Sequence, residues 1–182
     1  MSHYFLFLMA CMLPVQLDPK QDAMHQEAKR CIEATTKGDY KTLADLTYPG
    51  VIERIGGKER MIELIARGMD EMAEKGMKFK FGSVEAPSKL VQGEDGLYGV
   101  IPTSLVLETP DANLTLKGFL VGYSKDQGKT WVFIDGANGP DALRREFTQI
   151  PETLILPEKQ KPKFELKSEV LETQGTPTPA KP

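Results

Sequence analysis

A change in hydrophobic periodicity near residue 76 constrains the fold of this sequence more than any other feature. Between Asp22 and Gly76, apolar side chains recur every three or four residues, as they do on one face of a helix. From Met77 onward the spacing becomes two, and Phe79 and Phe81 alternate with lysines, which indicates a β-strand. We therefore expect an α+β protein in which helices come first and an antiparallel sheet follows.

Helices are expected in three stretches before this change. The first covers Asp22–Lys37, and a shorter second helix starts with Asp39 as its N-cap. The second helix should stop before Tyr48, because a residue that precedes proline disfavours helix, and the next residues read as a turn. A third helix is expected between Gly57 and Gly76. Its apolar stripe is predicted to pack in the core and consists of Met61, Leu64, Ile65, Met69 and Met72.

Strands are expected in the second half of the chain. The candidates are Met77–Phe81, Leu97–Leu107, Leu114–Tyr123, Thr130–Asp135 and a weaker one at Lys89–Val91. Pro102 lies inside one of these strands and should sit at an edge, at a bulge or where its missing N–H would face solvent. A short helix is predicted at Asp141–Phe147, followed by an ordered strap. Residues 158–182 are rich in Lys, Glu, Pro and Thr, so we expect a flexible tail.

A hairpin turn is predicted where Ser124, Asp126, Gly128, Thr130 and Trp131 match the Ser-x-Asp-x-Gly-x-Thr-Trp pattern. This pattern resembles the Asp-box turn that sialidases repeat. The aspartate can accept N–H groups within the turn, the glycine can adopt positive φ, and the tryptophan can pack over the loop. A single copy in a chain of this size predicts a hairpin and not a sialidase.

Composition narrows the class of partner. The chain has 182 residues, which suits one domain, and we place this domain at residues 19–157. Its 23 basic and 26 acidic side chains are spread along the chain and give a net charge of −3, which argues against nucleic-acid binding. No cysteine or histidine pair has metal-ligand spacing, so we predict neither a metal nor a cofactor.

The N-terminal segment, residues 1–18, is expected to be an export signal. The apolar run Tyr4–Leu13 has about half of the roughly 20 residues that a membrane-spanning helix needs. It resembles a bacterial lipoprotein signal that ends at Cys11, the residue that would carry the lipid. The expected location is therefore the periplasm or a membrane surface, with the lipid as the only membrane contact. The alternative is a short buried element of the domain. Cys31 is expected to be a core residue.

The order of elements resembles the nuclear transport factor 2-like superfamily. The resemblance covers about residues 20–136 and depends on the segments Lys37–Tyr40, Thr47–Pro49 and Trp131–Asp135. It implies a cone-shaped fold with a sheet curled around helices, an internal cavity and frequent homodimers. Members of the superfamily include isomerases, dehydratases, polyketide cyclases and binding modules, so the fold does not fix the function.

Four residues are candidates for ligand binding in such a cavity: Tyr48, Arg54, Trp131 and Asp135. Each also has a simpler role, as a packing residue, a solvated charge or a turn acceptor. No residue is predicted to be catalytic, because no known catalytic motif is present. We expect an exported, non-catalytic domain that binds a small apolar ligand or a protein partner. The alternatives are a small-molecule isomerase or lyase and a structural dimer whose cavity is filled by its own side chains.

Overall fold

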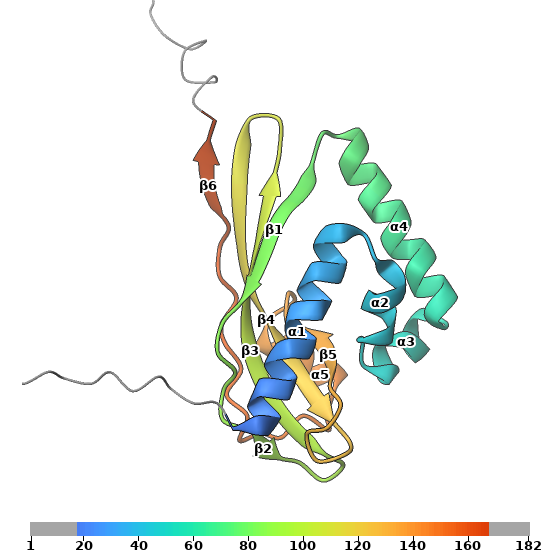
Figure 1. Ribbon diagram of the computed structural model, residues 1–182, viewed down its shortest axis with the longest axis vertical. Helices are drawn as coiled ribbons and strands as arrows, with labels where there is room; N and C mark the ends of the chain where they lie inside the picture. Colours follow the sequence, from blue (N-terminus) through green and yellow to red (C-terminus); the bar gives the residue numbers. More distant parts are fainter. Residues whose placement is uncertain (1–17, 168–182) are drawn as a thin grey trace, which may run out of the picture.

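The computed structural model describes residues 18–167 and is an α+β fold with its helices first (Figure 1). The helices of the first half are α1 (Pro19–Lys37), α2 (Tyr40–Asp45), α3 (Pro49–Ile55) and α4 (Lys58–Glu74). The elements of the second half are β1 (Lys78–Val84), β2 (Val91–Gln92), β3 (Leu97–Glu108), β4 (Ala112–Ser124), β5 (Val132–Asp135), α5 (Pro140–Glu146) and β6 (Lys163–Leu166). The signal segment and Cys11 lie outside the described residues.

The sheet is antiparallel, and its main strands run in the order β1-β3-β4-β5. Strands β3 and β4 form a long hairpin that is paired from Leu97 and Ser124 to Glu108 and Asn113. On one edge of this hairpin lie β1 and β2, and on the other lie β5 and β6. The sheet is not strongly curled (Figure 1), so it does not confirm the cone that the resemblance implies.

The first helix begins and ends as its sequence dictates. The Asp18 side chain accepts from the backbone N of Lys20 at 2.8 Å, and the Gln21 side chain accepts from the backbone N of Asp18 at 3.2 Å. Pro19 occupies the first turn, where no N–H is needed, and Gly38 ends the helix with φ 73°. This capping box extends α1 upstream of the expected start at Asp22.

The turn predicted after Tyr48 is instead the start of α3. Pro49 is the first residue of this helix, and the carbonyl of Tyr48 accepts from the backbone N of Val51 at 2.9 Å. A proline limits the residue before it, but at the first helical position its fixed φ favours a helix. The expected turn is therefore only the short junction between α2 and α3.

Two apolar clusters lie on opposite faces of the sheet. The cluster on the α1 face includes Met24, Cys31, Ile101, Trp131 and Phe133, and the other includes Tyr98, Val121, Leu143, Phe147 and Leu154. The Met24 side chain lies over Gly99 and Gly122, which are paired neighbours on β3 and β4. A Cβ at Gly122 would lie 2.6 Å from the Met24 methyl carbon, and one at Gly99 would lie 2.9 Å from its sulfur. Helix α1 thus approaches the sheet closely at two glycines, which have no side chain to keep it away.

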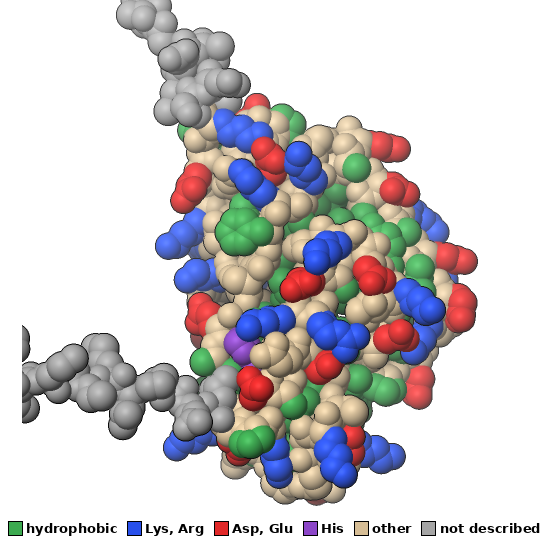
Figure 2. Space-filling model, in the orientation of Figure 1, with side chains coloured by type: hydrophobic (Ala, Val, Ile, Leu, Met, Phe, Trp, Pro, Cys, Tyr) green, Lys and Arg blue, Asp and Glu red, His purple; other side chains and the backbone are tan. Residues whose placement is uncertain are grey.

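Helix α4 is packed less deeply than its apolar stripe predicts. Of the five stripe residues only Met61 is buried, at 8% exposure, and Leu64 is 41% exposed. The helix packs against α2 and α3, and it meets the sheet mainly near β1. Figure 2 shows apolar side chains in the space between α1 and α4. The prediction of a core stripe therefore holds for one residue only.

The segment after α5 crosses the second face of the sheet as the expected strap. Its side chains Ile150 and Leu154 are buried against this face, at 4% and 1% exposure. Residues 163–166, which we expected in a flexible tail, form β6 and pair with β4 from Ala112 to Thr115. Backbone hydrogen bonds hold this strand, so it forms without burying its side chains. No helix in the described part of the chain has the length and apolar character needed to cross a membrane.

Candidate functional site

A pocket of about 300 Å³ lies at the edge of the sheet between α3, α5 and the end of β5, and we call it the α3–α5 pocket. Its lining consists of Val51, Arg54, Ile55, Ile134, Asp135, Asn138, Ala142, Leu143, Glu146 and Phe147. The chain before α3 positions this site. The backbone N of Phe133 donates to the carbonyl of Leu46 at 2.8 Å, and the backbone N of Tyr48 donates to the carbonyl of Phe133 at 2.9 Å. These bonds fix α3 beside β5.

Arg54 lies in the last turn of α3 and bridges to α5. Its guanidinium carbon lies 4.4 Å from the centroid of the Phe147 ring, within cation–π range. It donates to the backbone carbonyl of Glu146 and lies 3.7 Å from the Glu146 carboxylate. Both charged side chains are about half exposed, so the ion pair itself adds little stability. Arg54 lines the α3–α5 pocket, and its charge is already engaged with Glu146 and Phe147.

Asp135 also lines the pocket, at the end of β5. Its carboxylate accepts from the backbone N of Ala137 at 2.9 Å, which is the turn role that the sequence also allowed. Asp135 is an exposed residue, yet the protein around it desolvates its carboxyl enough to raise the pKa. The hydrogen bond from Ala137 lowers the pKa by a smaller amount. Asp135 is therefore an ionisable pocket residue whose pKa is raised.

Tyr48 supports the pocket from behind and does not line it. Its ring stands edge-on to Tyr123, with centroids 5.3 Å apart, and edge-on to Phe147 at 6.0 Å. Its hydroxyl accepts from the side-chain amide of Gln149 at 3.0 Å. These contacts give Tyr48 the packing role, and they hold the Phe147 wall in place.

Trp131, the fourth candidate, lies outside the α3–α5 pocket. It is 2% exposed in the cluster on the α1 face, and its indole N–H donates to the Gly128 carbonyl at 3.2 Å. The hairpin of the Asp-box pattern is confirmed: Asp126 accepts from the backbone N of Lys129 at 3.1 Å and of Thr130 at 2.9 Å. The bonds from Thr130 contribute most to lowering the pKa of Asp126 to about 2. Trp131 thus serves the hairpin and the core.

The apolar walls of the pocket were missed by sequence reasoning. Val51 and Ile55 belong to α3, which was expected to be a turn. Leu143 and Phe147 come from the predicted helix after β5, but nothing in their spacing indicates which element they face. A signal was available in Val51 and Ile55, which are four residues apart and would share one face of a helix.

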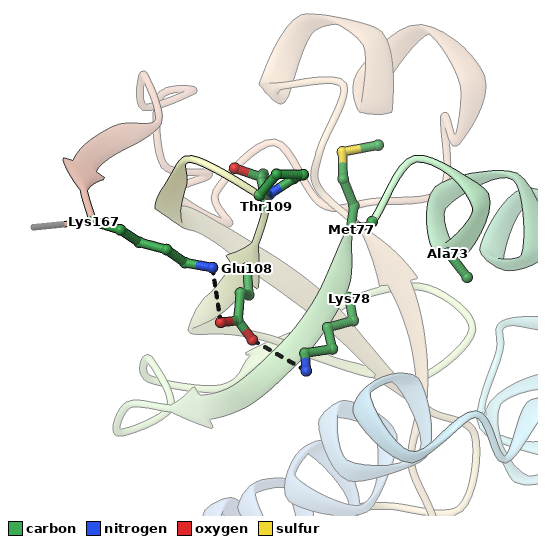
Figure 3. Close-up of a pocket in the computed structure, with 8 residues that line it drawn as sticks. Ala73, Met77, Lys78, Glu108, Thr109 and Lys167 are labelled. Atoms are coloured by element: carbon green, nitrogen blue, oxygen red, sulfur yellow. Dashed lines mark ion pairs between the residues drawn. The ribbon is translucent and has the colours of Figure 1, made fainter. Parts of the chain in front are cut away.

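A second cavity of about 360 Å³ lies at the far end of the sheet, near the α4–β1 turn (Figure 3). There the Glu108 carboxylate lies between two lysines, 3.3 Å from Lys78 Nζ and 3.1 Å from Lys167 Nζ. The two lysines, Lys167 first, lower the pKa of Glu108. Because one carboxylate occupies both ammonium groups, this cluster ties β1, β3 and the end of β6 together and leaves no free cation pair for a ligand.

Within residues 18–167, no group of three or more His, Cys, Asp or Glu side chains could hold a metal ion. A scan against models of protein families finds no match for the chain, and a search of curated proteins finds no relative. The fold and site therefore define an α+β protein with a ligand-sized pocket at its sheet edge.

Proposed function

We propose that the protein is a non-catalytic binding domain that takes up a small, mainly apolar ligand in the α3–α5 pocket. The observation that carries this proposal is the pocket lining, in which Val51, Ile55, Leu143 and Phe147 form apolar walls around a few polar groups. Ligand sites commonly have this composition, and a volume of about 300 Å³ is at the lower end of their range. The ligand is therefore about the size of one or two small rings.

The charges in the pocket favour a neutral ligand. Two carboxylates, Asp135 and Glu146, face one guanidinium, and Arg54 already binds Glu146 and covers Phe147. An anion would meet the carboxylates without a free cation to balance them. Asp135 and the Asn138 side chain offer hydrogen-bond acceptors, so a hydroxyl or N–H group on the ligand suits this site.

Export and superfamily membership are parts of the same proposal. The segment that ends at Cys11 supports export with a lipid anchor, and the order of helices before strands supports the nuclear transport factor 2-like superfamily. A protein partner is the second form of the binding hypothesis. The stripe of α4, where Leu64 is 41% exposed and Ile65, Met69 and Met72 are partly exposed, supports this form.

Amide NMR spectra with indole, phenol and benzoate as test compounds examine the ligand proposal. We expect indole and phenol to shift the resonances of Val51, Ile55 and Ala142, and benzoate to bind more weakly. Ala142→Phe fills the pocket and should abolish these shifts, whereas Ala73→Phe, at an exposed position on α4, should leave them intact. Shifts that survive Ala142→Phe, or stronger binding of benzoate, contradict the proposal.

An isomerase or lyase is a second candidate because of one observation, the raised pKa of Asp135 in a pocket. Such an enzyme needs a base beside a carbonyl compound, and a desolvated carboxylate is a suitable base. The test is deuterium exchange at the α-carbon of cyclohexanone in D₂O. Acceleration by the protein that is lost in Asp135→Asn would favour catalysis over simple binding.

A further inference from the structure

The outer edge of β6 has no partner strand among the described residues. Strand β6 pairs with β4 on one side only, and its outer side lies at the margin of the molecule (Figure 1). The backbone N of Lys167 donates to the carbonyl of Asp111 at 3.0 Å, so Lys167 directs its backbone groups toward β4. In a strand, the backbone N–H and C=O groups of successive residues point to alternate sides. The N–H and C=O groups of Phe164 and Leu166 therefore point outward, away from β4.

The side chains of β6 separate into an apolar and a charged face. Phe164 is 68% exposed and Leu166 is 59% exposed, and both lie on the face shared with Leu114 and Ala112 of β4. Lys163 and Glu165 lie on the opposite face, across from Thr115 and Asn113, which are uncharged. The strand thus presents free backbone groups, two apolar side chains and two opposite charges along one edge.

We propose that β6 pairs antiparallel with β6 of a second copy of this chain, about a twofold axis through Phe164. In this register Phe164 faces the second Phe164, Lys163 faces the second Glu165, and Glu165 faces the second Lys163. The two phenylalanines exchange two backbone hydrogen bonds, and each Leu166 N–H reaches a Pro162 carbonyl. Apolar and oppositely charged cross-strand pairs of this kind stabilise antiparallel sheets.

Other registers are less favourable. An axis through Glu165 places the two glutamates opposite each other and Lys163 opposite Lys167. A shift by one residue would place inward-directed groups opposite outward-directed ones and remove the hydrogen bonds. An axis through Leu166 places Glu165 opposite Lys167, which already binds Glu108 at 3.1 Å. The Phe164 register uses charges that have no ion-pair partner within residues 18–167.

The opposite edge of the sheet lacks these properties. Strand β1 carries Lys78 and Lys80, and its pairing with β3 is irregular between Phe79 and Phe81. Self-pairing of β1 would have no acidic side chain on the strand to balance these lysines, and its bulge also disfavours pairing, whereas β6 carries one lysine and one glutamate. The β6 contact itself is short. Pro162 has no N–H to donate, and beyond Pro162 the Lys161 side chain would face Lys167 of the second copy. We therefore expect an interface below about 1,200 Å² and a dimer that dissociates on dilution.

Charge exchange tests the pairing and its register. Sedimentation velocity of the full chain over a concentration series gives the dissociation constant. Lys163→Glu and Glu165→Lys should each weaken dimerisation roughly tenfold, because both cross-strand pairs become repulsive. The double variant restores opposite charges and should recover the dimer. In the Leu166 register Lys163 and Glu165 do not face each other, so the double variant would not recover the dimer.

Disulfide trapping provides an independent test in a Cys11→Ser background. Residues that face each other across the axis have Cα atoms about 5.5 Å apart, within reach of a disulfide. Phe164→Cys should therefore form a covalent dimer on mild oxidation, and the matched variant Leu166→Cys should not. A chain that stays monomeric at all concentrations, or cross-linking through position 166 instead of 164, overturns the proposal. Unfolding curves of each variant check that the fold is intact.

Discussion

The guanidinium carbon of Arg54 lies 4.4 Å from the centre of the Phe147 ring, and this contact joins α3 to α5 at the rim of the candidate pocket. Arg54 and Glu146, which bind each other beside that ring, are 92 positions apart in the sequence. The two walls of the pocket therefore depend on a tertiary contact, and their relative position should respond to changes at either residue.

Arg54→Ala should lower the free energy of unfolding by about 1 kcal/mol. The lost interactions are an exposed cation–π contact, worth about 0.5–1 kcal/mol, and one hydrogen bond to a backbone carbonyl. Arg54→Lys keeps the charge but not the planar group and should recover only part of the loss. Urea unfolding measures both variants. An unchanged stability in Arg54→Ala would show that the contact does not hold α3 against α5.

Asp126→Asn should destabilise the protein at neutral pH but not in strong acid. The pKa of Asp126 is lowered to about 2 in the folded state, chiefly by bonds from Thr130, against an ordinary value of 3.8. The ionised carboxylate therefore contributes stability above pH 4, and this contribution is lost as pH falls toward 2. Urea midpoints at pH 7 and pH 2 should show a difference between variant and wild type at the higher pH only. An equal loss at both values would point to hydrogen-bond geometry instead of charge.

Asp135 should have the opposite pH dependence. Its folded-state pKa is raised, mainly by desolvation, so the folded protein holds this proton more tightly than the unfolded chain does. Its contribution is fully present below the unfolded pKa of about 3.9 and is lost as pH rises through the folded pKa. Asp135→Asn keeps an oxygen that can accept from Ala137 and should remove this decline. Carbon-detected NMR titration of Asp135 gives the pKa directly, and an unshifted or lowered value contradicts the expectation.

Cys31 should resist thiol reagents while the protein is folded. Burial, with a smaller effect from Asp135, raises the pKa of its thiol to about 12, and the residue is 5% exposed. Since the thiolate is the reactive form, labelling at pH 8 should proceed only through unfolding. In a Cys11→Ser background, the labelling rate with a disulfide reagent should rise sharply in guanidinium chloride. Rapid labelling of the native protein would show that α1 opens locally.

The arrangement of helices before an antiparallel sheet could be predicted because Met24 and Ala28 repeat at helical spacing and Phe79 and Phe81 at strand spacing. Sequence rules for helix ends failed where one residue type is compatible with two structures. Pro49 ends a helix in one setting and starts one in another, and here it starts α3. Pro102 was expected at an edge, at a bulge or where its missing N–H would face solvent. It lies in β3 opposite Phe119 of β4, where β1 ends at Val84 on the other side.

The candidate site was predicted only in part, because sequence spacing does not specify which face of the sheet a side chain occupies. Arg54 and Asp135 come together at the pocket, whereas Tyr48 supports it and Trp131 belongs to the other face. The strand β6 was missed because its four side chains are exposed, so its order comes from backbone pairing that composition does not report.

The packing of Met24 over Gly99 and Gly122 has an evolutionary consequence. These three positions share one small volume, so related sequences should change them as a set. Where either glycine is replaced by a larger residue, position 24 should carry a shorter side chain, and a long one should persist only where both glycines remain. Covariation among these positions would thus record how close the first helix comes to the sheet throughout the lineage.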